Sequence, residues 1–200
     1  MTASCERIFI VGRDSLPERT LLDSAGTLHW TIVVPPGSSC NADLTIEFNA
    51  PDCELDLGAL FLCTGDEQVS LNVNVRHNSG NCRSRQQIRG IVGGRARAGF
   101  NGLIYVKRDA QHTKAYQECH SILLNEGARV EARPQLEIYA DDVECSHGAT
   151  SGFLDPEQLF YMRSRGIDED VARSLQLQAF LAPVLCRLPQ ELQDQFIEKL

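Results

Sequence analysis

The sequence predicts a mainly β body followed by a short α-helical tail. Between Leu28 and Val143, short runs alternate apolar and polar residues, which places apolar side chains on one face of each strand. Turn sequences rich in Pro, Gly and Asn separate these runs, and after Leu154 the apolar spacing becomes helical. More than a hundred residues of strand without a helix exclude a doubly wound α/β fold, because its parallel strands need helical crossovers.

Six alternating runs define the expected strands. The periodicity alone leaves a sandwich, a barrel or a β-solenoid open, since no strict short repeat distinguishes among them. In chain order, the positions that mark the runs are Leu28, Trp30, Ile32 and Val34; Leu44, Ile46 and Phe48; Leu55, Leu57 and Phe61; Val69, Leu71, Val73 and Val75; Gly102, Ile104 and Val106; and Leu136 and Ile138.

The first helix of the tail carries its own start and stop signals. Asp155 can cap free backbone amides, and Pro156 suits the first helical position. Arg163 and Arg165 precede Gly166, as expected where a helix ends and cations meet its negative pole. A helix is therefore predicted between Pro156 and Gly166.

Two further helices are expected beyond it. The second follows Asp168, and its predicted apolar stripe consists of Val171, Leu175, Ala179, Phe180 and Val184. Pro189 opens the third helix, where apolar residues recur every four positions. These residues form a face that could dock on another helix, and they are Leu192, Phe196 and Leu200. The tail is therefore expected to bind a partner.

Charge and cysteine usage limit the function. A net charge of −8 and a pI near 5.1 argue against binding nucleic acid or an anionic membrane through the whole surface. The opening apolar run, Ile8 to Val11, is too short for a signal peptide or a membrane span, so a cytoplasmic protein is expected. The eight cysteines include no CxxC pair, which favours reduced thiols. Without a GxxxxGK[ST] loop, nucleotide hydrolysis by the P-loop route is not expected.

One stretch of this acidic chain is basic. Six arginines and no acid lie between Arg76 and Arg97. Arg83 with Arg85, and Arg95 with Arg97, would form same-face pairs on strands that could receive a phosphate or an acidic partner. A solvated polar sheet face is the simpler interpretation.

The segment richest in chemistry is Cys145-Ser146-His147. Residues two apart in a strand project from one face, so a thiolate and an imidazole could meet one metal ion there. Such donors suit iron, zinc or an iron–sulfur species. Two ligands fall short of the usual number of about four, so the missing donors would come from elsewhere, including another chain. The alternative is a small buried Cys145 beside a hydrogen-bonded turn residue, His147.

Several motifs, in order, resemble those of the SufB/SufD family of iron–sulfur cluster assembly scaffolds. The resemblance covers roughly residues 88–180. Its motifs are Phe100 to Val106 (FNGLIYV), Gln117 to Leu124 (QECHSILL), Pro134 to Ile138 (PQLEI), Ala140 to Thr150 (ADDVECSHGAT), and Leu159 to Ile167. The DDVECSHGAT form is similar to SufD rather than to SufB, which places the chain on the SufD side of the family.

The resemblance implies a right-handed parallel β-helix (solenoid) with a short C-terminal helical tail. It divides the chain into a β-helix core at 1–153, whose N-terminal part matches more weakly, and a helical region at 154–200. Familiar SufD proteins carry more β-helix rungs and an additional N-terminal helical segment. A homodimer through the β-helix edge is therefore an alternative to the family's heterodimer.

The implied function is that of a scaffold subunit rather than an enzyme. SufD-like chains pair with a SufB-like subunit through the β-helix and dock a SufC-like ATPase through the C-terminal helices. The resemblance therefore implies these partner-binding residues: Leu159, Phe160, Tyr161, Arg163, Arg165, Leu192 and Phe196.

The resemblance also implies a role for the Cys-Ser-His segment. Carried over to this chain, it makes His147, with Cys145 beside it, a ligand of a nascent iron–sulfur cluster held transiently at a subunit interface. No cofactor is then expected in the isolated chain. The rival interpretation is a stand-alone β-fold metal-dependent enzyme that uses Cys145, His147 and a third ligand, although no third ligand occurs at a recognisable spacing.

Overall fold

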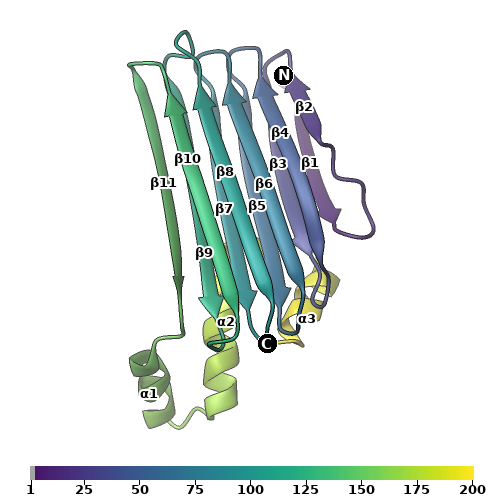
Figure 1. The fold of residues 1–200 in the computed structure, drawn as a ribbon, viewed down its shortest axis with the longest axis vertical. Coiled ribbons are helices and arrows are strands. Elements are labelled where there is room, and N and C mark those ends of the chain that lie inside the picture. Colours follow the sequence, from purple (N-terminus) through teal and green to yellow (C-terminus); the bar gives the residue numbers. More distant parts are fainter. Residues whose placement is uncertain (1–2) are drawn as a thin grey trace.

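The chain folds as a right-handed parallel β-solenoid followed by three helices, which confirms the predicted fold (Figure 1). The computed structural model describes residues 3–200, so the first two residues of the predicted β core lie outside it. Sheet A contains β1 (Ala3–Ile10), β3 (Gly26–Val34), β5 (Glu54–Cys63), β7 (Arg83–Val92), β9 (Thr113–Leu123) and β11 (Val143–Gly152). Sheet B contains β2 (Arg19–Leu22), β4 (Cys40–Phe48), β6 (Gln68–His77), β8 (Arg97–Val106) and β10 (Arg129–Ile138).

Each coil of the solenoid contributes one strand to each sheet. Neighbouring strands are parallel and in register one coil apart, so Cys40 pairs with Val69 and Val69 pairs with Ala98, in steps of 29 residues. Strict alternation within a strand then stacks apolar side chains in rows that run through the molecule. On β6 every inward position is buried, beginning with Val69.

The main core lies between the two sheets. Its large side chains include Phe48, Phe61 and Phe100, each at most 2% exposed. Gly90 on β7 is required here, since a Cβ at that position would lie 2.0 Å from the Phe61 ring. The aromatic ring of one coil therefore occupies the space that a side chain on the next coil would need.

The inward rows of β7 and β9 are partly polar, and this explains why apolar alternation did not reveal these strands. Buried positions on β7 include Ser84 and Gln86, and those on β9 include Thr113, Gln117 and Ser121. The amide Nε2 of Gln117 donates to Oε1 of Gln86 across 2.8 Å, so the two side chains form a buried amide pair. Pairing of this kind allows polar groups inside a core.

The predicted first helix begins and ends where its sequence signals place it. Helix α1 (Pro156–Ser164) is capped by Asp155, whose carboxylate accepts from the Glu157 amide at 2.9 Å. Gly166 follows with a φ of +86°, and its amide donates to the Arg163 carbonyl. This glycine allows the left-handed turn that closes the helix.

Helices α2 (Glu169–Leu185) and α3 (Gln190–Ile197) cover part of the outer face of sheet A (Figure 1). Strand and helix residues form a second core there, made of Ile10, Val33, Leu60, Leu62, Ile91, Leu177, Leu181, Val184, Leu185, Leu188 and Phe196. The predicted stripe of α2 is wrong in part, because Val171 and Leu175 are 52% and 44% exposed while Leu177 and Leu181 face the sheet. Among residues 3–200, none of the helices is long and apolar enough to cross a membrane.

Candidate functional site at the last coil

The last coil leaves two strand edges open. Strand β11 pairs only with β9, and β10 pairs only with β8, so within the described residues each has one unpaired backbone edge (Figure 1). Side chains here are far less buried than in the middle of the solenoid: no residue of β10 or β11 is fully buried. Open parallel edges are surfaces on which another strand can pair.

Cys145 and His147 lie on the inward face of β11. In register, Cys145 is opposite Ala115 and His147 is opposite Gln117, both of which point into the core from β9. Cys145 is half-buried and packs with Val143 against the small apolar cluster at this end. His147 is exposed, so its imidazole remains accessible from outside the chain.

The environment of Cys145 keeps its thiol protonated. Burial raises the pKa of the Cys145 thiol, and a hydrogen bond from the Ala115 backbone opposes this shift only in part. The thiolate is the form that binds a metal, so coordination at Cys145 would release a proton.

The coil below His147 presents a buried amide with an unused polar atom. Gln117 is 0% exposed, and its Oε1 has no hydrogen-bond partner. Its amide reaches across the interior to Gly102 on sheet B, where a Cβ would lie 2.4 Å away. Sequence patterns gave no sign of this arrangement, because the two residues meet only through the coiling of the chain.

The two donors do not form a complete metal site within the chain. Among residues 3–200, no group of three or more His, Cys, Asp or Glu side chains is arranged to hold a metal ion. Cys145 and His147 therefore supply an incomplete donor set that faces an open edge. Thiolate and imidazole together suit iron and iron–sulfur species.

The neighbouring pair Cys119-His120 is divided between the two faces of β9, as strand alternation predicts. Cys119 is 1% exposed and faces the core, where burial raises its pKa to about 12. His120 is on the outer face, and its Nδ1 lies 2.6 Å from Thr150 Oγ1 of β11. The two side chains therefore cannot ligate one ion.

Helix α1 presents the predicted partner-binding residues Phe160 and Tyr161 to solvent. They are 73% and 59% exposed, Leu159 is half-buried, and no residue of α1 is fully buried. Arg163 forms an ion pair with Glu169 at 3.1 Å. Arg165 lies 5.2 Å from the centroid of the Tyr161 ring.

The predicted contribution of helix α3 to this surface needs correction. Phe196 is only 1% exposed and belongs to the core between the helices and sheet A, and Leu192 packs beside it. The four-residue spacing was correctly read as one apolar face, but that face packs against the chain's own sheet. A docking surface is therefore to be sought on α1.

The arginines between Arg76 and Arg97 do not gather into one site. Arg76 stacks on Tyr105 at 4.1 Å on the outer face of sheet B, whereas Arg83 and Arg85 line a hollow on sheet A. Arg97 is back on sheet B, at the start of β8. Coiling of the chain distributes these charges over opposite faces.

The fold is thus an open-ended parallel β-solenoid whose last coil carries a thiol and an imidazole on its inward face. Comparison with known proteins identifies the family. The SUF system FeS cluster assembly, SufBD core domain matches residues 17–180. The chain belongs to this family.

Three relatives named SufD place the chain close to that branch of the family. The chain is 39% identical over 155 residues to the iron–sulfur cluster assembly protein SufD of Escherichia coli, covering 78% of this chain and 37% of that protein. It is 41% identical over 102 residues to SufD of Bacillus subtilis, covering 51% and 23%. SufD of Plasmodium berghei is 32% identical over 154 residues, covering 76% and 11%. The matched part of the chain thus corresponds to 37% of the length of the Escherichia coli protein and to a smaller share of the other two.

Proposed function

We propose that this chain is a scaffold subunit of a SUF-type iron–sulfur cluster assembly complex and catalyses no reaction itself. Membership of the SufBD family supports this role. The observation that carries the proposal is that half-buried Cys145 and exposed His147 share the inward face of β11, whose other edge is unpaired. The cluster is the cargo of such a complex, and the β-helix part, 1–153, would hold it while 154–200 docks the ATPase.

The proposed partner at the last coil is a SufB-like subunit, with a second SufD-like copy as the alternative. Free backbone groups along β10 and β11 could extend both sheets into the neighbour. Apolar side chains at this end add area for contact, since Ile138, Tyr139 and Phe153 are 38%, 57% and 60% exposed. A partner seated there would bring its own donors next to Cys145 and His147, and a transient cluster needs these additional ligands.

The proposed partner at the tail is a SufC-like ATPase. Helix α1 has no buried residue, so little of its surface is used for the chain's own folding. Phe160 and Tyr161 expose large aromatic side chains, and Val171 and Leu175 of the following helix, α2, are exposed as well. Aromatic residues of this kind are common at the centres of protein interfaces.

A reconstituted complex tests the ligand role. The subunit is combined with SufB-like and SufC-like partners, iron and sulfide, and cluster formation is followed by absorbance. His147→Ala should leave the free energy of unfolding within about 0.5 kcal/mol, because the side chain is exposed, but should greatly reduce the cluster yield. His112→Ala is the matched control, since His112 is also exposed but lies in the turn before β9. Normal cluster assembly by the His147 variant would overturn the ligand role.

A pull-down tests the docking role. Phe160→Ala/Tyr161→Ala should reduce recovery of the SufC-like ATPase without changing recovery of the SufB-like subunit. Leu21→Ala provides the control, because Leu21 is 46% exposed at the opposite end of the solenoid, on β2. Equal ATPase recovery with both variants would exclude α1 as the docking surface.

A further inference from the structure

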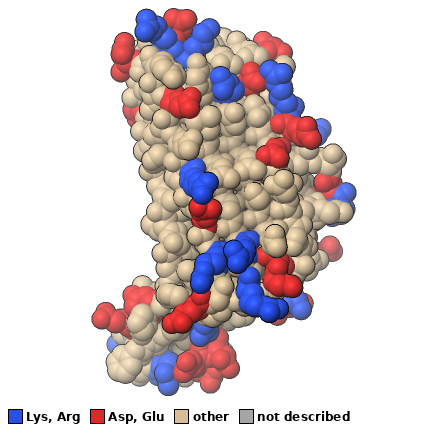
Figure 2. Space-filling view, viewed as in Figure 1, with Lys and Arg blue, Asp and Glu red and all other residues tan. Residues whose placement is uncertain are grey.

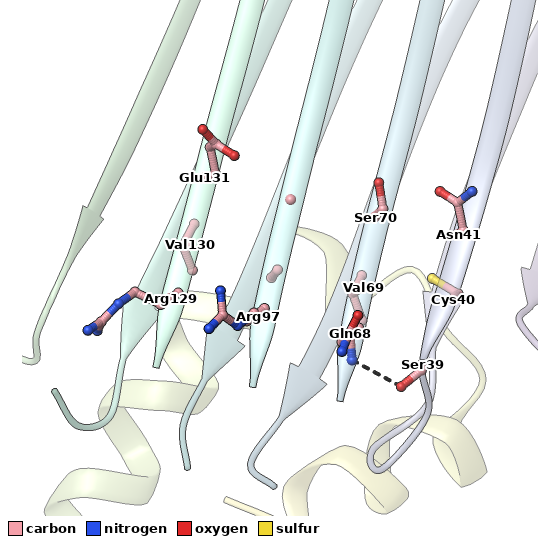
Figure 3. Close-up of a pocket in the computed structure, with 12 residues that line it drawn as sticks. Ser39, Cys40, Asn41, Gln68, Val69, Ser70, Arg97, Arg129, Val130 and Glu131 are labelled. Atoms are coloured by element: carbon pink, nitrogen blue, oxygen red, sulfur yellow. Dashed lines mark hydrogen bonds between the residues drawn. The ribbon is translucent and has the colours of Figure 1, made fainter. Parts of the chain in front are cut away.

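A trough crosses the outer face of sheet B, away from Cys145 and His147. It runs over β4, β6, β8 and β10 near the starts of these strands, with a volume of about 880 Å³ (Figure 3). Small-molecule sites in proteins typically enclose about 300–1,000 Å³. Lys and Arg side chains gather in a band over the lower ends of the front strands (Figure 2). The trough therefore combines suitable size with positive charge in a protein whose net charge is −8.

The floor of the trough is a row of short side chains. Asn41, Ser70 and Gly99 are register neighbours on three adjacent strands, and all three positions face outward. A Cβ at Gly99 would have only the Val69 carbonyl oxygen within 4 Å, at 3.8 Å, so the space above Gly99 is open. The depression thus results from residue size in one row.

One wall of the trough carries two neighbouring cations. Gln68, Arg97 and Arg129 are in register, so the two arginines start from neighbouring positions on adjacent strands (Figure 3). Nη1 of Arg129 donates to the main-chain carbonyls of Glu126 and Ala128 at 2.5 and 2.9 Å. Within residues 3–200, neither guanidinium forms an ion pair with an acidic side chain. Figure 3 shows the Arg129 guanidinium turned away from Arg97, toward the turn that its bonds join, so an anion would lie against Arg97 and be attracted at longer range by the Arg129 charge.

Beyond the trough, the next outward row of sheet B forms a ladder of side-chain hydrogen bonds. Asn72 donates to Asp43 at 2.8 Å and Asn101 donates to Asn72 at 2.7 Å, and these three residues line a neighbouring hollow. Glu131, the acid that lines the trough, is held by Arg133 of its own strand. Glu131 is in register with Gly99, so it ends the floor row on β10 with its carboxylate paired to Arg133.

We propose that this trough binds a phosphate-bearing small molecule. The phosphate lies against Arg97, because a planar guanidinium group matches phosphate oxygens with paired hydrogen bonds, and the Arg129 charge attracts it at longer range. The polar body of the ligand lies over Ser70 and Gly99, where the hydroxyl of Ser70 and the amide of Gln68 can bond to ligand hydroxyls. This site uses neither of the cluster-ligand candidates, so it stands or falls independently of the proposed scaffold function.

Titration of the full chain, followed by amide NMR spectra, tests the site with ribose 5-phosphate and with inorganic phosphate as probes. Ribose 5-phosphate should bind more tightly, with shifts in β6, β8 and β10. Arg97→Gln/Arg129→Gln should weaken binding of both probes by at least about tenfold, since charge-assisted hydrogen bonds are lost. Arg76→Gln is the control, because Arg76 is on the same sheet face but outside the trough. If Arg76→Gln weakened binding as much as each of the two trough substitutions does, the site would be overturned.

A second variant distinguishes binding of the ligand body in the trough from simple attraction of phosphate to the arginines. Gly99→Leu fills the floor without changing charge, and its outward, open position allows folding. It should remove the advantage of ribose 5-phosphate over inorganic phosphate and leave binding of phosphate itself. If the two probes bind equally to the unmodified chain, or if Gly99→Leu leaves the ester's advantage intact, the ligand body does not lie in the trough and the proposal fails.

Discussion

Acidification should destabilise the solenoid through one buried histidine, His77 at the end of β6. The residue is 0% exposed, and burial lowers the pKa of its imidazole from 6.5 to about 3, because a charged ring would lose its hydration there. Nε2 lies 2.9 Å from Ser84 Oγ, and the ring packs edge-on against Phe48 at a centroid distance of 4.8 Å. Only the neutral ring fits this environment.

The sign and size of the effect follow from that shift. Because the folded-state pKa of His77 is below the unfolded value of 6.5, its contribution to stability is fully present above pH 6.5 and is lost as the pH falls towards 3. One pKa unit corresponds to about 1.4 kcal/mol, and at pH 5 about one and a half units of the shift have been lost. The free energy of unfolding should therefore fall by about 2 kcal/mol between pH 7 and pH 5 because of this group.

Urea denaturation at pH 7 and pH 5 measures this loss. The comparison protein is His77→Phe/Ser84→Ala, which keeps an aromatic ring against Phe48 and removes the hydroxyl that would lose its partner. The other four histidines are present in both proteins, so their contributions cancel. The unmodified chain should lose about 2 kcal/mol more than the double variant. Equal losses in the two proteins would refute the reasoning.

Three further predictions concern the core, the thiols and the first helix. Phe196→Ala should destabilise the chain by about 3–5 kcal/mol in urea denaturation, since the ring is 1% exposed; a loss below 1 kcal/mol would place it outside the core. At pH 8 a thiol reagent should label Cys186 in the folded chain, because it is exposed, whereas Cys63 and Cys119, whose pKa values burial raises to about 12, should react only after unfolding. Hydrogen exchange should be faster in α1 than in α2, because no residue of α1 is buried; protection equal to that of α2 would contradict its loose attachment.

The strands that the sequence revealed are those whose inward rows are apolar. On β6 the buried positions begin with Val69 and alternate without a break, so a single sequence shows the strand clearly. On β7 the inward row opens with Ser84 and Gln86, which are buried but polar. Gln86 pairs with Gln117 of the next coil, 31 residues away, and Ser84 pairs with His77 of the opposite sheet, and strand alternation reports neither contact.

The candidate site was predictable in part for the same reason. Alternation alone puts Cys145 and His147 on one face, and the structure places both on the inward face of β11. That this face is open depends on β11 being the last strand of its sheet, which periodicity cannot show. Likewise, the spacing of Leu192 and Phe196 defines an apolar face but does not say whether the chain itself or a partner covers it.

The phosphate trough lay beyond sequence reasoning altogether. Its floor joins Asn41, Ser70 and Gly99, which are separated by 29 residues at each step and become neighbours only through the register of the coils. The two arginines of its wall, Arg97 and Arg129, are likewise adjacent only in the folded chain. Rows across a solenoid become visible once the pairing of the strands is known.

The central claim is that His147 coordinates a cluster shared with a partner subunit at the last coil. Pulsed electron paramagnetic resonance on the reconstituted, reduced complex, with histidine of this subunit alone labelled with nitrogen-15, tests it directly. We predict a nitrogen-15 coupling typical of an iron-bound imidazole that disappears in His147→Ala and persists in His112→Ala. A cluster that forms without that coupling, or a coupling that survives in His147→Ala, would contradict the account.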